Sequence, residues 1–169
     1  MHSQMYCLKT NQSRITLLIV SLSALLLSAC STPQRQAGFD GHSASGAKSE
    51  LVANAHLLLG APYRYGGNRP STGFDCSGFV QYTHATVGIH LPRTSRQQYR
   101  ASRLIGKQHL RPGDLVFFRI NKKRTISHVG IYIGKGKFIH APSSGKRVSI
   151  ARLDDPYWQR HYSSAGRVF

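Results

Sequence analysis

The amino-acid sequence predicts an α+β domain in which N-terminal helices pack on an antiparallel β-sheet of about five to six strands. Two observations carry this prediction. Apolar residues between about positions 50 and 102 recur with helical spacing, whereas from about position 115 onward they alternate with a period of two. The chain has 169 residues, which allows one such domain with appendages and is too short for two enzymatic domains.

The segment before the domain has the features of an export signal. Lys9 and Arg14 precede the apolar run Ile15–Leu27, which falls short of the roughly 18 to 20 residues that cross a bilayer. Small residues then lead into Cys30, as in the cleavage box that bacterial lipoproteins share. This resemblance implies a signal peptide at 1–29, acylation of Cys30 and, with Ser31 next to it, an outer-membrane anchor facing the periplasm. A plain export signal that happens to end in cysteine is the alternative.

Residues 30–49 predict a flexible tether, because they are rich in Ser, Gly, Ala and Gln and show no apolar period. The folded domain is then expected at 50–169. Its first helix should begin after Ser49, with apolar residues at helical spacing, and should end at Gly60. Asp75 has the character of an N-cap for a second helix over 76–87, and a third helix is expected over 95–102. Strands are expected at 115–119, 127–133, 138–141, 148–152 and 166–169.

The charge balance limits the possible partners. Lys and Arg number 23 against 6 Asp and Glu, a formal net charge of +17. Composition alone would favour nucleic acid, but the export signal argues against that partner. Arg93, Arg96, Arg100 and Arg103 follow one another at helical spacing and predict one cationic face. That face is either merely solvated or in contact with acidic wall polymers or membrane headgroups.

Cys76 is the thiol that remains once Cys7 leaves with the signal and Cys30 carries lipid. A lone thiol in an exported protein has no disulfide partner, so it is either a buried apolar residue or a nucleophile. Asp75 places Cys76 at the start of a helix, where the helix dipole and free N–H groups favour the thiolate. The polar neighbours in this turn make the catalytic interpretation the stronger one.

A thiol nucleophile needs a base, and two of the nine histidines lie inside predicted strands. Alternation puts His128 on one strand face with Gly130, which leaves room beside it. If the turn Gly134–Gly136 is a three-residue loop with Gly136 left-handed, His140 shares that face, diagonally adjacent to His128. A two-residue loop would instead send the two histidines to opposite faces.

Several segments of the domain together resemble the NlpC-type family of papain-like cysteine peptidases, which are bacterial cell-wall endopeptidases. The resemblance implies that Cys76 is the nucleophile, His128 the base and His140 the residue that orients it. It also implies that Tyr63 lies near the oxyanion and that Asp75 and Ser77 line the substrate pocket. The segments are Tyr-Arg-Tyr-Gly-Gly from Tyr63, Phe-Asp-Cys-Ser-Gly-Phe-Val from Phe74, Leu-Pro-Arg from Leu91, Pro-Gly-Asp-Leu-Val-Phe-Phe from Pro112, His-Val-Gly-Ile-Tyr-Ile from His128 and Phe-Ile-His-Ala from Phe138.

The function implied by the resemblance is hydrolysis of amide bonds in peptidoglycan stem peptides or cross-links, without a cofactor. Stem peptides carry free carboxylates, which suit a basic protein. The bond within the stem, D-glutamyl to diaminopimelate, and the cross-link bond, D-alanyl to diaminopimelate, both remain open, as does regulation by another protein. Two alternatives come from other classes: a zinc site made by Cys76, His128 and His140, and a non-catalytic peptidoglycan-binding lipoprotein.

Overall fold

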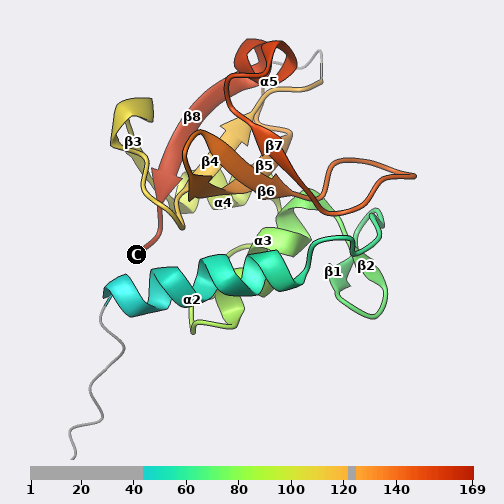
Figure 1. Ribbon diagram of the computed structural model, residues 1–169. Helices are drawn as coiled ribbons and strands as arrows, with labels where there is room; N and C mark the ends of the chain where they lie inside the picture. Colours follow the sequence, from blue (N-terminus) through green and yellow to red (C-terminus); the bar gives the residue numbers. More distant parts are fainter. Residues whose placement is uncertain (1–43, 122–124) are drawn as a thin grey trace, which may run out of the picture. The chain divides into compact units, whose positions relative to one another are not determined.

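A six-stranded antiparallel sheet forms one layer of the domain, and helices α2 and α3 lie beneath it (Figure 1). The computed structural model describes residues 44–121 and 125–169. The strand order is β3-β8-β4-β5-β6-β7, so the last strand of the chain is inserted next to β4. This arrangement confirms the predicted α+β class. None of the described helices is both long and apolar enough to cross a bilayer.

The helices match the predicted positions with one shift at the start. Helix α2 begins at Ala44, six residues before the predicted start, so residues 44–49 are helical rather than part of a tether. Ala44 and Ala47 have high helix propensity, and Lys48 lies over the ring of Phe169, which explains the longer helix. The remainder of the predicted tether and the signal lie outside the described residues. The helices are α2 (Ala44–Leu57), α3 (Cys76–Ala85), α4 (Ser95–Ala101) and α5 (Pro156–His161), with a 3₁₀ turn η2 (Lys107–His109).

The strands include every predicted segment and additional ones. Helix α5 and strand β3 were not predicted, and β8 begins four residues before its expected start. β3 could not be predicted because it is short, lies at the sheet edge and is largely exposed, so its sequence shows no apolar alternation. The strands are β1 (Asn68–Arg69), β2 (Gly73–Phe74), β3 (Arg103–Ile105), β4 (Leu115–Phe118), β5 (His128–Gly134), β6 (Lys137–His140), β7 (Ser149–Arg152) and β8 (Tyr162–Arg167).

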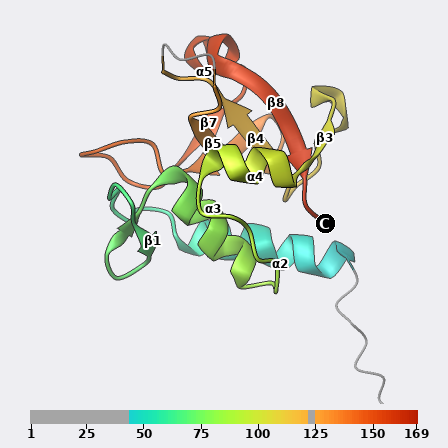
Figure 2. The ribbon, with the colours of Figure 1, turned by 180° about the vertical axis from the view of Figure 1, so that it is seen from behind.

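Each face of the sheet carries its own hydrophobic cluster. The larger one contains Val129 and Ile131 of β5 and packs against α2 and α3. Helix α4 also belongs to this side, since the ring of Tyr99 meets that of Phe117 edge to face, and it lies across the strands in the reverse view (Figure 2). A smaller cluster on the other face includes Phe118 and Phe138. The expected alternation along β5 is therefore confirmed.

The hairpin between β5 and β6 has the predicted register but a different turn. Ile131 pairs with Ile139 and Tyr132 with Phe138, as the three-residue loop required. However, Gly134 pairs with Lys137, so the loop itself is the two-residue Lys135-Gly136, with φ of 51° and 70°. The register shifts between Tyr132 and Gly134, which makes Ile133 the extra residue of a β-bulge. The bulge restores the pairing that a two-residue loop alone would have moved by one position.

Candidate active site

Cys76 is the first residue of α3, and Asp75 caps that helix as predicted. The Asp75 carboxylate accepts a hydrogen bond of 2.7 Å from the backbone N–H of Gly78. The backbone N–H groups of Ser77 and Val129 lie close enough to the half-buried Cys76 thiol to lower its pKa. Cys76 also packs against the hydrophobic cluster that contains Val129, the residue that follows His128 in β5.

The N–H group of Ser77 at the start of the helix lowers the pKa of Cys76, the direction expected, but burial outweighs this effect. Burial, followed by the negative charge of Asp75, raises the pKa of Cys76 to about 11. The N–H groups of Val129 and Ser77 and the charge of Arg93 oppose this shift without reversing it. The thiol is thus protonated at neutral pH, and a nearby base has to remove its proton.

The two strand histidines form one hydrogen-bonded pair. Nε2 of His128 lies 2.8 Å from Nδ1 of His140, and the two rings are nearly perpendicular. Both side chains are almost completely buried, with 4% and 3% exposure. Burial lowers the pKa of His128 to about 4, and it lowers the pKa of His140 further together with the charges of His128 and Lys146. Both rings are therefore neutral at neutral pH.

Gly130 makes room for this pair. A Cβ at Gly130 would lie 2.6 Å from the Phe138 ring and 3.3 Å from the Cβ of His140. A side chain at this position would displace Phe138 and His140 from the face that they share with His128. The prediction that a glycine beside His128 leaves room is confirmed, and Phe138 and His140 occupy that room.

Trp158 belongs to the same cluster and was missed in the sequence. Its indole stacks on the ring of His128 at 5.6 Å between centroids and meets His140 edge to face at 4.8 Å. It also packs on Phe118 and Phe138. The signal that could have located it is Asp155-Pro156, an N-cap followed by proline at the first helical position. Nothing local indicates that the indole reaches the histidines.

A polar network surrounds the carboxylate next to Cys76. Arg93 contacts both oxygens of Asp75, at 2.9 and 2.6 Å, and also contacts the hydroxyl of Ser77. Burial alone would raise the pKa of Asp75, but hydrogen bonds from Arg93 and Gly78 outweigh it and lower that pKa. The predicted cationic face is therefore wrong in part. Arg93 precedes α4 and is an ion-pair partner, and Arg103 lies in β3.

Tyr63 lies on the same side of the site. Its backbone N–H donates to the carbonyl of Lys146, and its neighbour Pro62 bridges to Arg147. Burial raises the pKa of its phenol, and the charges of Cys76 and Asp75 add to that shift. The structure thus gathers Tyr63, Asp75 and Ser77 around Cys76 and pairs His128 with His140. Cys30 lies outside the described residues.

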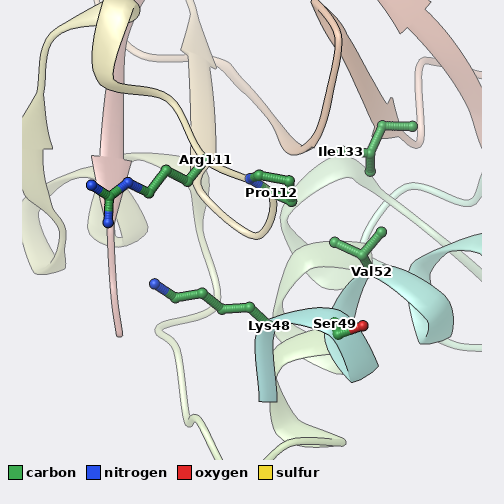
Figure 3. A pocket seen from close by; sticks show the side chains of 6 residues that line it. All are labelled: Lys48, Ser49, Val52, Arg111, Pro112 and Ile133. Carbon is green, nitrogen blue, oxygen red and sulfur yellow. The ribbon is translucent and has the colours of Figure 1, made fainter. Parts of the chain in front are cut away.

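A separate hollow of 380 Å³ lies between the start of α2 and the end of β5 (Figure 3). Lys48, Val52 and Ile133 are among its lining residues, and none of the predicted site residues lines it. In the described part of the chain, no group of three His, Cys, Asp or Glu side chains is placed to share one metal ion.

Comparisons with known proteins agree with this geometry. The model of the NlpC/P60 family matches residues 60–167. The chain is 46% identical over 134 residues to murein DD-endopeptidase MepH of Escherichia coli, covering 76% of this chain and 49% of that protein. It is 44% identical over 110 residues to the gamma-DL-glutamyl hydrolase of Bacillus subtilis, covering 64% of this chain and 26% of that protein. The chain thus spans about half the length, or less, of these curated relatives.

Solved structures give the same result. An NlpC/P60 family protein from Bacillus cereus superimposes with a TM-score of 0.68 at 37% identity, covering 72% of this chain and 40% of that chain. The NlpC/p60 domain of the peptidoglycan hydrolase SagA gives a TM-score of 0.62 at 32% identity, covering 71% and 97%. The sequence segments quoted above, the fold and the similarity to both curated relatives and solved structures all agree. The chain therefore belongs to the NlpC/P60 family.

Proposed function

We propose that the protein is a peptidoglycan hydrolase that cleaves amide bonds in stem peptides or cross-links with Cys76, His128 and His140. The observation that carries the proposal is the packing of Cys76 against the cluster that contains Val129, next to His128, whose ring is hydrogen-bonded to His140 at 2.8 Å. Names of relatives support the substrate, since MepH is a murein endopeptidase and CwlT of Bacillus subtilis is a muramidase/DL-endopeptidase.

The ring geometry supports one proton path in this proposal. His140 is bonded to Nε2 of His128, so Nδ1 of His128 is the atom left to take the proton of Cys76. Once protonated there, His128 donates its Nε2–H to Nδ1 of His140. His140 must then carry its own proton on Nε2. In this arrangement His140 fixes the ring orientation and the tautomer of His128, as the third member of a triad does.

The chemistry proceeds in two halves. The sulfur of Cys76 attacks the amide carbon while His128 takes the thiol proton, and a C–S bond forms. Backbone N–H groups at the start of α3 and the hydroxyl of Tyr63 stabilise the oxyanion. His128 then gives its proton to the amine as the C–N bond breaks. Water, deprotonated by His128, hydrolyses the thioester and returns the thiol.

The pKa values fit a base that acts during the attack. A thiol with a pKa of about 11 and an imidazole with a pKa of about 4 form a neutral pair at rest. The proton therefore moves as the C–S bond forms rather than beforehand. We expect activity to fall on the acid side as His128 becomes protonated.

The test is digestion of purified sacculi, with the released muropeptides identified by mass spectrometry. Wild-type protein should release cleaved stems or cross-links, and Cys76→Ser should lose nearly all activity while keeping its circular dichroism spectrum. Iodoacetamide should inactivate the wild type and a chelator should not, which separates the thiol mechanism from a zinc site. Normal activity of Cys76→Ser would overturn the cysteine mechanism and leave a binding role for this site.

We also propose that acylation of Cys30 anchors the protein to the outer membrane, facing the periplasm. The support is the apolar run that ends in small residues before Cys30, with Ser31 after it. Mass spectrometry of the mature N-terminus should find acyl groups on Cys30, and Cys30→Ala should leave unprocessed precursor. An unmodified mature N-terminus, or processing that resists globomycin, would contradict the anchor.

A further inference from the structure

A second hollow lies at the β1–β2 hairpin. This hairpin packs beside α3 (Figure 1, Figure 2). Its volume is 310 Å³, and its lining includes Arg64, Tyr65 and Arg69. Tyr65 is 89% exposed, which is an unusually high exposure for an aromatic side chain. The hollow therefore offers a flat ring and two guanidinium groups to solvent.

The two guanidinium groups have no counter-charge. Within the described chain, neither the Arg64 nor the Arg69 side chain forms a hydrogen bond or an ion pair, and no Asp or Glu lines the hollow. The nearby carboxylate is that of Asp75, and Arg93 already contacts both of its oxygens. The positive potential of the hollow is thus available to a ligand.

The backbone under these side chains is fixed by close contacts. Gly67 lies against α3 so tightly that a Cβ at Gly78 would be 2.0 Å from the Gly67 carbonyl oxygen. The hairpin is also paired, with Asn68 opposite Phe74 and Arg69 opposite Gly73. A rigid frame lowers the entropic cost of binding, because only the two long side chains have to be ordered.

The same backbone connects the hollow to the reacting thiol. The N–H of Gly66 donates to the Asp75 carboxylate, and the N–H of Asp75 donates to the carbonyl of Gly67. Asp75 directly precedes Cys76. Tyr65 is also close enough to influence the pKa values of Tyr63 and Arg93. A substrate held at Cys76 would therefore have its neighbouring residues within reach of the hollow.

We propose that Arg64 and Arg69 form a subsite for a free carboxylate of the stem peptide, next to the bond that is cut, with Tyr65 packing against the peptide. This inference rests on the proposed function. Guanidinium groups bind carboxylates through paired, charge-assisted hydrogen bonds, which an amide in the same place does not reproduce. The subsite would thus distinguish stems with free carboxylates from amidated stems.

Binding to the inert Cys76→Ala protein tests the subsite without hydrolysis. The probes are a stem tetrapeptide with free D-glutamate and diaminopimelate carboxylates and two analogues, each amidated at one of these residues. Calorimetry should show weaker binding of one analogue. Arg64→Gln and Arg69→Gln should each weaken binding of the free acid about two- to fivefold, as expected for exposed ion pairs. Neither substitution should affect the analogue that has lost the recognised carboxylate.

The matched control is Arg103→Gln, which removes the same charge from the exposed edge strand β3. It should leave both affinities unchanged. Equal losses in Arg64→Gln, Arg69→Gln and Arg103→Gln, or equal losses for free and amidated peptides, would overturn the subsite and leave only general charge attraction. Failure of the wild-type protein to cleave any stem would instead contradict the proposed function, since the binding preference is measured separately.

Discussion

The two halves of the candidate site are built from different interactions. Around Cys76, a polar network of Asp75, Ser77 and Arg93 holds the first turn of α3 through hydrogen bonds and an ion pair. Among the described residues, the side chains of His128 and His140 make a single hydrogen bond, to each other, and their surroundings are aromatic. The thiol half is thus held by directional bonds, and the histidine half is held by packing.

This difference assigns different tasks to the two halves. Hydrogen bonds to backbone groups hold the first turn of α3 in place, because such bonds act only over a short range. They thereby fix where the sulfur lies relative to a bound amide. Aromatic packing excludes water and keeps the imidazoles neutral, which a base needs before it can accept a proton. Substitutions in the two halves should therefore fail in different ways, and variants at four positions, His128, His140, Trp158 and Arg93, separate them.

The largest effect is expected in the histidine pair. His128→Asn removes the proposed base and should lower kcat by roughly 10³-fold, within the range attributed to general base catalysis. His140→Asn keeps a polar partner for His128 and should retain more activity than His140→Ala. Rates of stem-peptide cleavage should therefore fall in the order wild type, His140→Asn, His140→Ala, His128→Asn. A fully active His140→Ala protein would show that the observed ring contact has no part in catalysis.

A smaller effect is expected for the indole over the histidines. Trp158→Ala admits water to His128 and should lower kcat roughly 10- to 100-fold, a range typical of small misplacements of reacting groups, with KM unchanged. The pKa of His128 should rise from about 4 toward 6.5, although the nearby charge of Asp75 acts on it in both proteins. The acid limb of the pH profile should therefore move to higher pH.

Trp158→Phe is the matched control for that variant, because it keeps an aromatic ring on the histidines. It should retain most of kcat and leave the acid limb near its wild-type position. If Trp158→Ala lowers activity at all pH values without moving the acid limb, the indole contributes to folding alone and does not control the histidine pair.

The smallest effect is expected in the polar half. Arg93→Met should lower the free energy of unfolding by about 1 kcal/mol, since the bond is charge-assisted but Arg93 is 34% exposed. The pKa of Asp75 is lowered in the folded protein, so its stabilisation is present above the unfolded pKa and is lost as pH falls through the folded pKa. Without Arg93, the folded pKa of Asp75 lies closer to its unfolded value, so acidification should remove less stabilisation and the loss should be complete at a higher pH.

Urea unfolding at pH 7 and at pH 4 measures both quantities. The control is Arg100→Met on α4, whose side chain is exposed and which should change stability by less than about 0.5 kcal/mol. Equal unfolding free energies for Arg93→Met and wild type at both pH values would mean that the ion pair does not stabilise the turn before Cys76.

The same contrast explains what the sequence revealed. The thiol half is local: Asp75, Cys76 and Ser77 are consecutive, and an N-cap can be identified from one residue and its neighbours. Arg93 escaped that analysis because its partner lies 18 positions earlier in the chain. The pairing of the two histidines could be predicted only by assuming a length for the turn between β5 and β6. Trp158 and α5 could not be placed there, because no periodic pattern connects a six-residue helix to the far face of a sheet.

The β5–β6 hairpin also limits which changes of loop length the site can accept. Its bulge and two-residue loop together set the pairing register that places the side chains of residues 128 and 140 on the same face of the sheet. A register shift of one residue would place them on opposite faces. Hairpin loops usually tolerate changes in length, but a single-residue insertion or deletion here would leave a foldable hairpin and separate the two imidazoles. A loop grafted into this hairpin therefore has to preserve the register of β5 and β6 rather than the loop sequence.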